Sequence, residues 1–124
     1  MYHVEFDQPA NLLKISYGGR VEPAETKRCL EALERLRPEL RPGFRLLTDL
    51  SALETMDLAS IPHIKRIMDF CNQQGIAQVV RVIPDPHKDI GLNIMSLFHY
   101  GRQVRFVTCV SLDEALAVLA GGGG

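Results

Sequence analysis

The chain has 124 residues, of which 46% are hydrophobic and 23% are charged, as in an ordinary globular domain. Fourteen Lys and Arg residues against fifteen Asp and Glu residues leave a formal net charge of −1, so there is no basic excess with which to bind nucleic acid. Neither a signal peptide nor an apolar run of membrane-spanning length is recognisable, and the three cysteines have no CxxC spacing. We therefore expect a cytoplasmic protein with reduced thiols and no membrane span.

The N-terminal segment alternates apolar and polar residues over Tyr2–Phe6 and again over Leu12–Tyr17, which is typical of half-buried strands. The turn residues between the two runs predict an antiparallel hairpin. Gly18 and Gly19 predict a bend after the second strand. Pro23 then suits the first turn of a helix, whose apolar positions recur at helical spacing until a proline-rich stretch ends it.

The middle of the chain indicates a strand, a polar turn and an amphipathic helix. Phe44–Leu50 has few polar interruptions and predicts a strand that is covered on both faces. The apolar stripe that follows the turn predicts a helix ending at Gly75. Two residues compete as the N-cap of this helix, Ser60 and, one turn earlier, Asp57. Ser60 is favoured because it places Pro62 in the first turn.

The C-terminal part continues the alternation of strands and helices. Ile76–Ile83 is the most apolar run and predicts a buried strand, and Asp85–Tyr100 predicts a helix. Val104–Cys109 predicts a further strand, and Ser111 opens a short helix with a capping box. Gly121–Gly124 cannot pack against a core, so we expect a disordered tail.

The predicted order is therefore β-β-α-β-α-β-α-β-α. Repeated alternation of strands and helices predicts right-handed crossovers between parallel strands. We predict one α/β domain over residues 1–120, built on a single-layer mixed, mostly parallel five-stranded sheet with about four helices. The first strand is expected at or near an edge of the sheet.

This element order resembles that of the STAS domain, which is found in anti-sigma factor antagonists and at the cytoplasmic end of sulfate transporters. A local pattern adds to the resemblance, because Asp49-Leu50-Ser51-Ala52 is similar to the D-L-S-G-like segment that ends the family's third strand. Asp57 then precedes Leu58-Ala59-Ser60, where the family has a serine pair and a glycine. The resemblance implies a STAS-like fold and a protein partner, such as an anti-sigma factor or a kinase-like regulator.

The sequence departs from the family at the position of its phosphorylation switch. In phosphorylation-switched members, the second serine of the pair accepts phosphate from a partner kinase, and Ala59 stands at that position here. Ser60 lies one residue later and substitutes for it only if the turn is offset. We therefore predict that co-expression with a family kinase gives no phosphate at the Asp57–Ser60 turn.

Arg81 is unusual because it lies inside the apolar run VVRVI. Either it snorkels from a strand end, or it forms a structural ion pair within the sheet. The candidate partner is Asp49, near the end of the preceding parallel strand. Such a partly buried pair is more often structural than functional.

Polar residues near strand ends and helix starts are the candidates for partner binding. Helix capping explains Asp85, but it leaves His87 and Lys88 unexplained, because cations near a helix N-terminus are mildly unfavourable. The candidate partner-binding residues are Asp49, Ser51, Asp57, Ser60, His63, Asp85, His87 and Lys88. The sequence has no metal-ligand spacing, no glycine-rich phosphate loop and no nucleophile elbow, so we expect neither an enzyme nor a bound metal or cofactor.

Two functional hypotheses follow, and a homodimer is compatible with either. The first is a non-enzymatic regulatory module for protein–protein interaction, which resembles an anti-sigma factor antagonist without the usual serine switch. The second is a small-ligand or lipid carrier whose apolar cleft lies between the last two helices. That cleft would be lined by Ile94, Met95, Leu97, Phe98 and Leu116. An exposed apolar patch beside Asp57–His63 favours the first hypothesis, and an open cavity favours the second.

Overall fold

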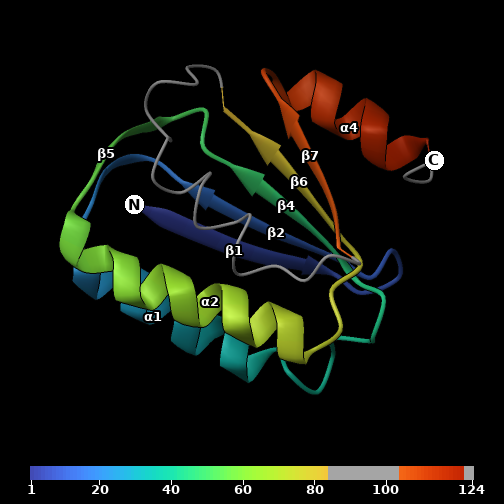
Figure 1. The fold of residues 1–124 in the computed structure, drawn as a ribbon, viewed down its shortest axis with the longest axis horizontal. Helices are drawn as coiled ribbons and strands as arrows, with labels where there is room; N and C mark the ends of the chain where they lie inside the picture. The colour runs from blue at the N-terminus through green and yellow to red at the C-terminus, as the bar shows by residue number, and fades with distance from the viewer. Residues whose placement is uncertain (84–103, 122–124) are drawn as a thin grey trace.

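The computed structural model describes residues 1–83 and 104–121, which form two sheets and the helices that cover them (Figure 1). The larger sheet has five strands, β1 (Tyr2–Asp7), β2 (Leu12–Tyr17), β4 (Arg45–Asp49), β6 (Gln78–Val82) and β7 (Arg105–Cys109), and this is also their order across the sheet. The smaller sheet pairs β3 (Gly19–Val21) with β5 (Leu53–Met56). The helical segments are α1 (Pro23–Arg35), the short 3-10 helix η1 (Leu58–Ser60), α2 (Ile61–Gln73) and α4 (Leu112–Ala120).

The five-stranded sheet is mixed and mostly parallel. β1 runs antiparallel to β2, and every other neighbouring pair is parallel. β1 forms one edge. All five residues of β6 are buried, as its apolar sequence predicts. The sheet and the position of its first strand are therefore confirmed.

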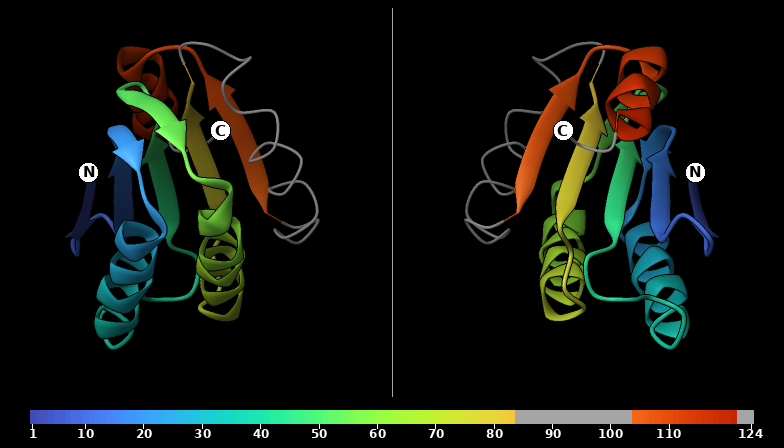
Figure 2. Two further views of the ribbon diagram at one scale, coloured as in Figure 1. Left: turned by 90° about the vertical axis from the view of Figure 1, so that its left-hand side faces the viewer. Right: turned by 90° about the vertical axis from the view of Figure 1, so that its right-hand side faces the viewer.

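Alternate residues of the strands face two different helical layers. α1 and α2 lie on one side of the sheet and α4 lies on the other (Figures 1 and 2). Leu13, Leu46 and Val79 belong to the core beneath α1 and α2. Their sequence neighbours Leu12, Leu47 and Val80 belong to the smaller core beneath α4. The period-two alternation of a strand thus supplies both cores from the same three strands.

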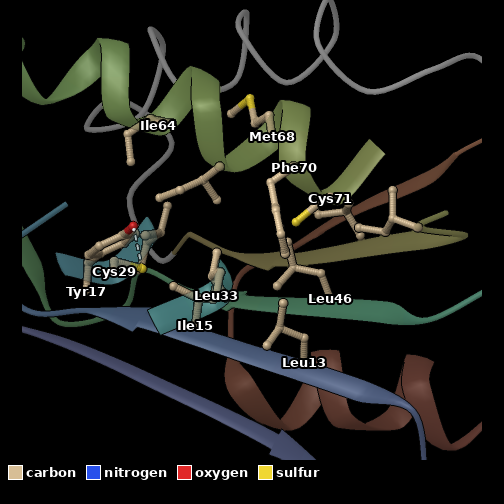
Figure 3. Packing of buried hydrophobic residues seen from close by; sticks show 14 of the residues in the cluster. Leu13, Ile15, Tyr17, Cys29, Leu33, Leu46, Ile64, Met68, Phe70 and Cys71 are labelled. Carbon is tan, nitrogen blue, oxygen red and sulfur yellow. Dashed lines mark hydrogen bonds between the residues drawn. The ribbon is translucent and has the colours of Figure 1, made fainter. Parts of the chain in front are cut away.

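The core beneath α1 and α2 is closely packed (Figure 3). Leu13 from β2 and Leu33 from α1 have no exposed surface, and Leu46 from β4 is 1% exposed. Full burial of one such side chain stabilises the fold by about 1.5–3 kcal/mol. The Tyr17 hydroxyl donates a hydrogen bond of 3.4 Å to the Cys29 sulfur and so satisfies a polar group inside this apolar layer.

The smaller sheet corrects the interpretation of two segments. Gly19 has a φ of +64°, in keeping with the predicted bend, but the chain then forms β3 before it enters α1. The segment after Asp49, interpreted as a polar turn, contains β5, which pairs in parallel with β3. The Asp57 amide adds a further bond of 3.0 Å to the Val21 carbonyl oxygen. The fold therefore has a second small sheet that the sequence interpretation lacks.

The two competing caps belong to different helices. The Asp57 carboxylate accepts a bond of 2.8 Å from the Ala59 amide and so caps η1. Ser60 occupies the N-cap position of α2, but its side chain makes no capping bond. Pro62 lies in the first turn of α2, as predicted. Gly75, shortly after the helix end, has a φ of +85°, as expected of a glycine that terminates a helix.

The predicted helix Asp85–Tyr100 lies outside the described residues, which contain three α-helices and η1 rather than about four helices. Gly121, the first residue of the predicted tail, is the C-cap of α4, and its amide donates to the Ala117 carbonyl oxygen. Residues 122–124 of the glycine tail are not described. Among the helices described, none has the length and apolar character needed to cross a membrane.

Candidate functional site

The connection from β5 to α2 presents an apolar surface beside a capped turn. Leu58 is 81% exposed, although it follows the capping residue Asp57 directly. The other residues of this surface are Met56, Ala59, Ile61 and Pro62, which are exposed or half-buried. We call these five residues the Met56–Pro62 surface. Sequence interpretation places Leu58 in a polar turn, and the one available signal is a leucine that lies outside the apolar stripe of the following helix.

Ala59, which the family resemblance places at the switch position, and Ser60, one residue later, lie in different environments. Ala59 is exposed on η1 and has no hydroxyl group. The Ser60 side chain has no exposed surface, and its hydroxyl oxygen makes no hydrogen bond to any described residue. A kinase needs an accessible hydroxyl oxygen as its acceptor, and the Ser60 hydroxyl is buried in this structure.

His63, on α2, contacts Thr26 of the neighbouring helix α1. Its Nδ1 atom lies 3.0 Å from the hydroxyl oxygen of Thr26, and that hydroxyl donates a bond of 2.9 Å to the Pro23 carbonyl oxygen. A hydroxyl group has one hydrogen, so Thr26 accepts here and His63 Nδ1–H donates. His63 is half-buried and is held by α1. The sequence signal for this contact is the position of Thr26 on the inward stripe, three residues before Cys29.

A wide hollow adjoins the Met56–Pro62 surface. It has a volume of about 490 Å³ and is lined by Arg20, Glu54, Thr55, Met56 and Asp57. Arg20, Glu54 and Asp57 are exposed, so the charges around this hollow remain hydrated. Charged groups around exposed apolar side chains are the arrangement found at protein–protein interfaces, with their apolar centre and polar rim.

Asp49 and Ser51 lie elsewhere, at the end of β4. The Asp49 carboxylate accepts a bond of 3.0 Å from the Ser51 amide and so fixes the turn after the strand. Asp49 lines a groove of about 210 Å³ on the α4 side of the sheet, together with His3, Glu5, Lys14, Ile15, Ser16, Leu47, Leu112 and Leu116. The carboxylates of Asp49 and Asp57 therefore line different hollows.

The predicted ion pair between Asp49 and Arg81 is wrong. Their strands are adjacent, but the register pairs Arg81 with Thr48 and Asp49 with Val82. Successive residues of a strand face opposite sides, so Arg81 lies toward α1 and α2 while Asp49 lies toward α4. Arg81 is buried, and its guanidinium carbon lies 4.8 Å from the centroid of the Phe106 ring. This cation–π contact gives Arg81 a structural role.

An apolar cavity remains between the sheet and α2. Its volume is about 50 Å³, and it is lined by Ile15, Tyr17, Leu46, Thr48, Leu50, Ile64, Ile67, Met68, Val79 and Arg81. Ligand pockets typically enclose about 300–1,000 Å³, so this space is much smaller than a lipid or a nucleotide requires.

The cysteines are unsuited to nucleophilic chemistry. All three are buried and unlinked. Burial raises the pKa of the Cys29 thiol to about 11, an effect that the hydrogen bond from Tyr17 partly offsets. Burial, and to a smaller extent the neighbouring Cys29, raises the pKa of the Cys71 thiol to about 12. The thiolate is the reactive form, and in both residues it is suppressed.

Most of the remaining predicted site residues lie outside the part of the chain that the structure describes. Asp85, His87 and Lys88 lie outside the described residues, as do four of the five residues of the predicted lipid cleft. The fifth, Leu116, is 44% exposed and lines the groove that contains Asp49. Within residues 1–83 and 104–121, no group of three or more His, Cys, Asp or Glu side chains is arranged to hold a metal ion.

No family model and no curated protein sequence matches the chain, but solved structures do. An uncharacterised DUF3478-family protein with a SpoIIAA-like fold, from Shewanella loihica PV-4, matches with a TM-score of 0.69 and 16% identity, over 96% of this chain and 92% of that chain. The unphosphorylated anti-sigma factor antagonist SpoIIAA matches with a TM-score of 0.63 and 12% identity, over 98% of this chain and 99% of its own. An anti-sigma factor antagonist from Mycobacterium paratuberculosis matches with a TM-score of 0.58 and 19% identity, over 97% of this chain and 93% of its own.

The chain has a SpoIIAA-like STAS fold. The predicted resemblance is thereby confirmed at the level of the fold. At identities of 12% to 19% the likeness concerns the fold alone, so the roles of individual residues rest on this chain's own geometry.

Proposed function

We propose that this protein is a non-enzymatic regulatory module that binds a protein partner through the Met56–Pro62 surface, without a serine phosphorylation switch. The observation that carries the proposal is the pairing of an exposed Leu58 with a buried Ser60 at the start of α2. The apolar contact surface is accessible, and the neighbouring hydroxyl is not. The likeness to anti-sigma factor antagonists supports the class of function.

The composition of the Met56–Pro62 surface supports binding to a protein. Along this stretch, Asp57 is the one exposed side chain that is charged, and its carboxylate is engaged in capping η1. A short segment that is apolar at its centre and fixed by a cap loses little conformational freedom when a partner covers it. Arg20 and Glu54, in the adjoining hollow, supply charges at the rim that can select the partner.

The test is a quantitative capture experiment with the tagged chain and a lysate of its source organism. Leu58→Asp is the informative variant, because an 81% exposed side chain contributes little to folding. We expect Leu58→Asp to abolish recovery of the proteins that wild type retains. Val110→Asp is the matched control, since Val110 is 62% exposed and lies outside this surface, and it should recover the same proteins. Equal recovery by wild type and Leu58→Asp would contradict the proposal.

A second measurement tests independence from phosphorylation. Co-expression with an anti-sigma factor kinase should leave the intact mass unchanged, because Ala59 has no hydroxyl and Ser60 is buried. Ala59→Ser places a hydroxyl at the exposed position and should gain the mass of one phosphate. Phosphate found stoichiometrically on Ser60 of the wild type would show that the turn opens and that the switch operates.

The carrier hypothesis makes a different prediction for the same purified protein. Native mass spectrometry of a lipid or nucleotide carrier would show protein plus ligand. The cavity between the sheet and α2, of about 50 Å³, is too small for such a ligand. The cleft predicted between the last two helices lies mostly outside the described residues, so protein mass alone would contradict the carrier hypothesis and bound ligand would support it.

A further inference from the structure

β1 leaves an open edge on the five-stranded sheet. It is the outermost strand on its side, and among the described residues it pairs with β2 alone. Both views of Figure 2 place it at the side of the sheet opposite β7. Natural sheets usually protect such an edge with a proline, a lysine or a β-bulge. The strand YHVEFD has no proline or lysine, and its register with β2 runs without a shift.

The hydrogen bonds to β2 determine which backbone groups of β1 are left over. Met1 and Gly18 exchange two bonds, of 2.8 and 2.9 Å, so they form a hydrogen-bonded pair. In an antiparallel ladder such pairs alternate with pairs that exchange no bonds. With the register His3↔Ser16, the amides and carbonyls of Tyr2, Val4 and Phe6 therefore point away from β2. These three residues form a regular, unsatisfied edge.

The side chains of β1 are complementary to β1 itself in one antiparallel register. When Val4 lies opposite Val4 of a second copy, His3 lies opposite Glu5 and Glu5 opposite His3. A shift by two residues in one direction places Glu5 opposite Glu5, with His3 opposite Asp7 on either side, and a shift in the other direction places His3 opposite His3. The centred register is distinguished because no two like side chains among His3 and Glu5 face each other in it.

The centred register also pairs the outward backbone groups of the two copies and brings their apolar side chains together. Its three hydrogen-bonded pairs would be Tyr2–Phe6, Val4–Val4 and Phe6–Tyr2, which are the residues whose backbone groups point outward. The side chains of these residues are half-buried against the core beneath α1 and α2, so part of their apolar surface is open at the edge. A second copy would cover it with the same three side chains.

We propose that β1 is a self-association surface, through which two copies pair antiparallel about a two-fold axis at Val4. The two five-stranded sheets then become one continuous sheet, and α1 of each copy lies on the same side of it. The interface is isologous, because both copies contribute the same residues to it. Its small area makes it a reversible contact rather than a permanent one.

Sedimentation equilibrium over a concentration series tests this pairing. We expect wild type to dimerise reversibly. Glu5→Lys removes the acceptor from both His3–Glu5 cross-strand pairs and should weaken dimerisation at least about tenfold. The double variant H3E/E5H exchanges the two side chains, restores complementarity in the centred register and should return the dissociation constant to within about threefold of wild type. Lys65→Glu, which reverses an exposed charge on α2 outside β1, should behave as wild type.

A covalent probe locates the two-fold axis independently. Facing residues of a hydrogen-bonded antiparallel pair have Cα atoms about 5.5 Å apart, which suits a disulfide. Val4→Cys should therefore oxidise to a linked dimer, while the three buried native cysteines stay reduced. Val110→Cys, which exposes a thiol away from the edge, should not link under the same conditions. A wild type that stays monomeric at millimolar concentration, or a dimer insensitive to Glu5→Lys, would overturn the proposal.

Discussion

The two faces of the five-stranded sheet are covered unequally. α1 and α2 cover one face, where Leu13 and Leu46 are buried in the larger core. α4 packs on the other face against β6 and β7, and the part over β1, β2 and β4 stays open as the groove of about 210 Å³. That groove contains charged side chains such as Glu5, Lys14 and Asp49. Substitutions of core residues on the covered face should therefore lower the free energy of unfolding more than substitutions on the open face.

The largest expected effect compares two neighbouring residues of β2. Leu13 is fully buried on the covered face, so Leu13→Ala should lower the free energy of unfolding by about 2–5 kcal/mol. Lys14→Ala, on the open face, should change it by less than about 0.5 kcal/mol. Urea denaturation followed by circular dichroism measures both values. Equal destabilisation by the two variants would show that the faces do not differ as described.

The buried thiols of the covered face predict a loss of stability in alkali. An unfolded thiol has a pKa of about 8.5, and the folded pKa values of Cys29 and Cys71 are raised to about 11 and about 12. Above about pH 8.5 the unfolded chain loses these protons first, so the free energy of unfolding should fall by about 1.4 kcal/mol per thiol for each pH unit. The stabilisation is complete below that pH and is lost as the pH rises through the folded values.

Urea midpoints at about pH 8 and about pH 10 measure this loss, which should reach about 2 kcal/mol for each thiol. The variant C29A/C71A is the control, because it has no buried thiols on this face. Its stability at neutral pH should be lower, but its alkaline loss should be smaller than that of wild type. Parallel losses in the two proteins would assign the effect to other groups.

A smaller effect is expected where α1 meets α2 over the covered face. Thr26→Val removes the oxygen that accepts the bond from His63 Nδ1–H and leaves that donor without its partner. The expected cost is about 1–3 kcal/mol, and Thr26→Ser should restore most of it, because it keeps the hydroxyl. Nitrogen NMR of His63 provides a second measurement, since the Nδ1–H tautomer should dominate in wild type. A dominant Nε2–H form would contradict the assignment.

The smallest effect is expected at α4, on the half-covered face. The Ser111 hydroxyl accepts a bond of 3.1 Å from the Glu114 amide and caps this helix. Ser111→Ala should therefore cost about 1 kcal/mol, and Ser111→Asp, which keeps an acceptor, should cost only a few tenths. Thermal unfolding compares the two variants. A cost for Ser111→Ala as large as that of Leu13→Ala would indicate that α4 contributes as much stability as the covered face.

Long apolar patterns predict the fold well in this chain. Phe44–Leu50 and Ile76–Ile83 became β4 and β6 within two residues, and the capping residues located the starts of α1 and α4. β3 and β5 are absent from the sequence interpretation because they are short and because Arg20, Glu54 and Thr55 give them no alternating pattern. Their stability comes from pairing between segments that are distant in the sequence, which local patterns do not encode.

The candidate site is less predictable than the fold. Asp57 caps η1 and His63 lies in the first turn of α2, but Asp49 lies in a different hollow from Asp57. The error at Arg81 and Asp49 arises from register, because a difference of one residue between parallel strands moves a side chain to the other face. Exposure of Leu58 could not be predicted, since an isolated leucine in a turn is compatible with burial and with exposure.

The β3–β5 pair links the Met56–Pro62 surface to the start of α1. β3 leads directly into α1 and β5 leads through η1 into α2, so the parallel pair joins the starts of both helices. The bond from the Asp57 amide to the Val21 carbonyl oxygen lies beside the Met56–Pro62 surface. A partner that presses on Leu58 would thus restrain the beginning of α1 as well. Hydrogen exchange at the Asp57 amide should therefore slow when a partner binds. Because this amide bonds to Val21, just before α1, its exchange rate would report binding at a point that connects both helices.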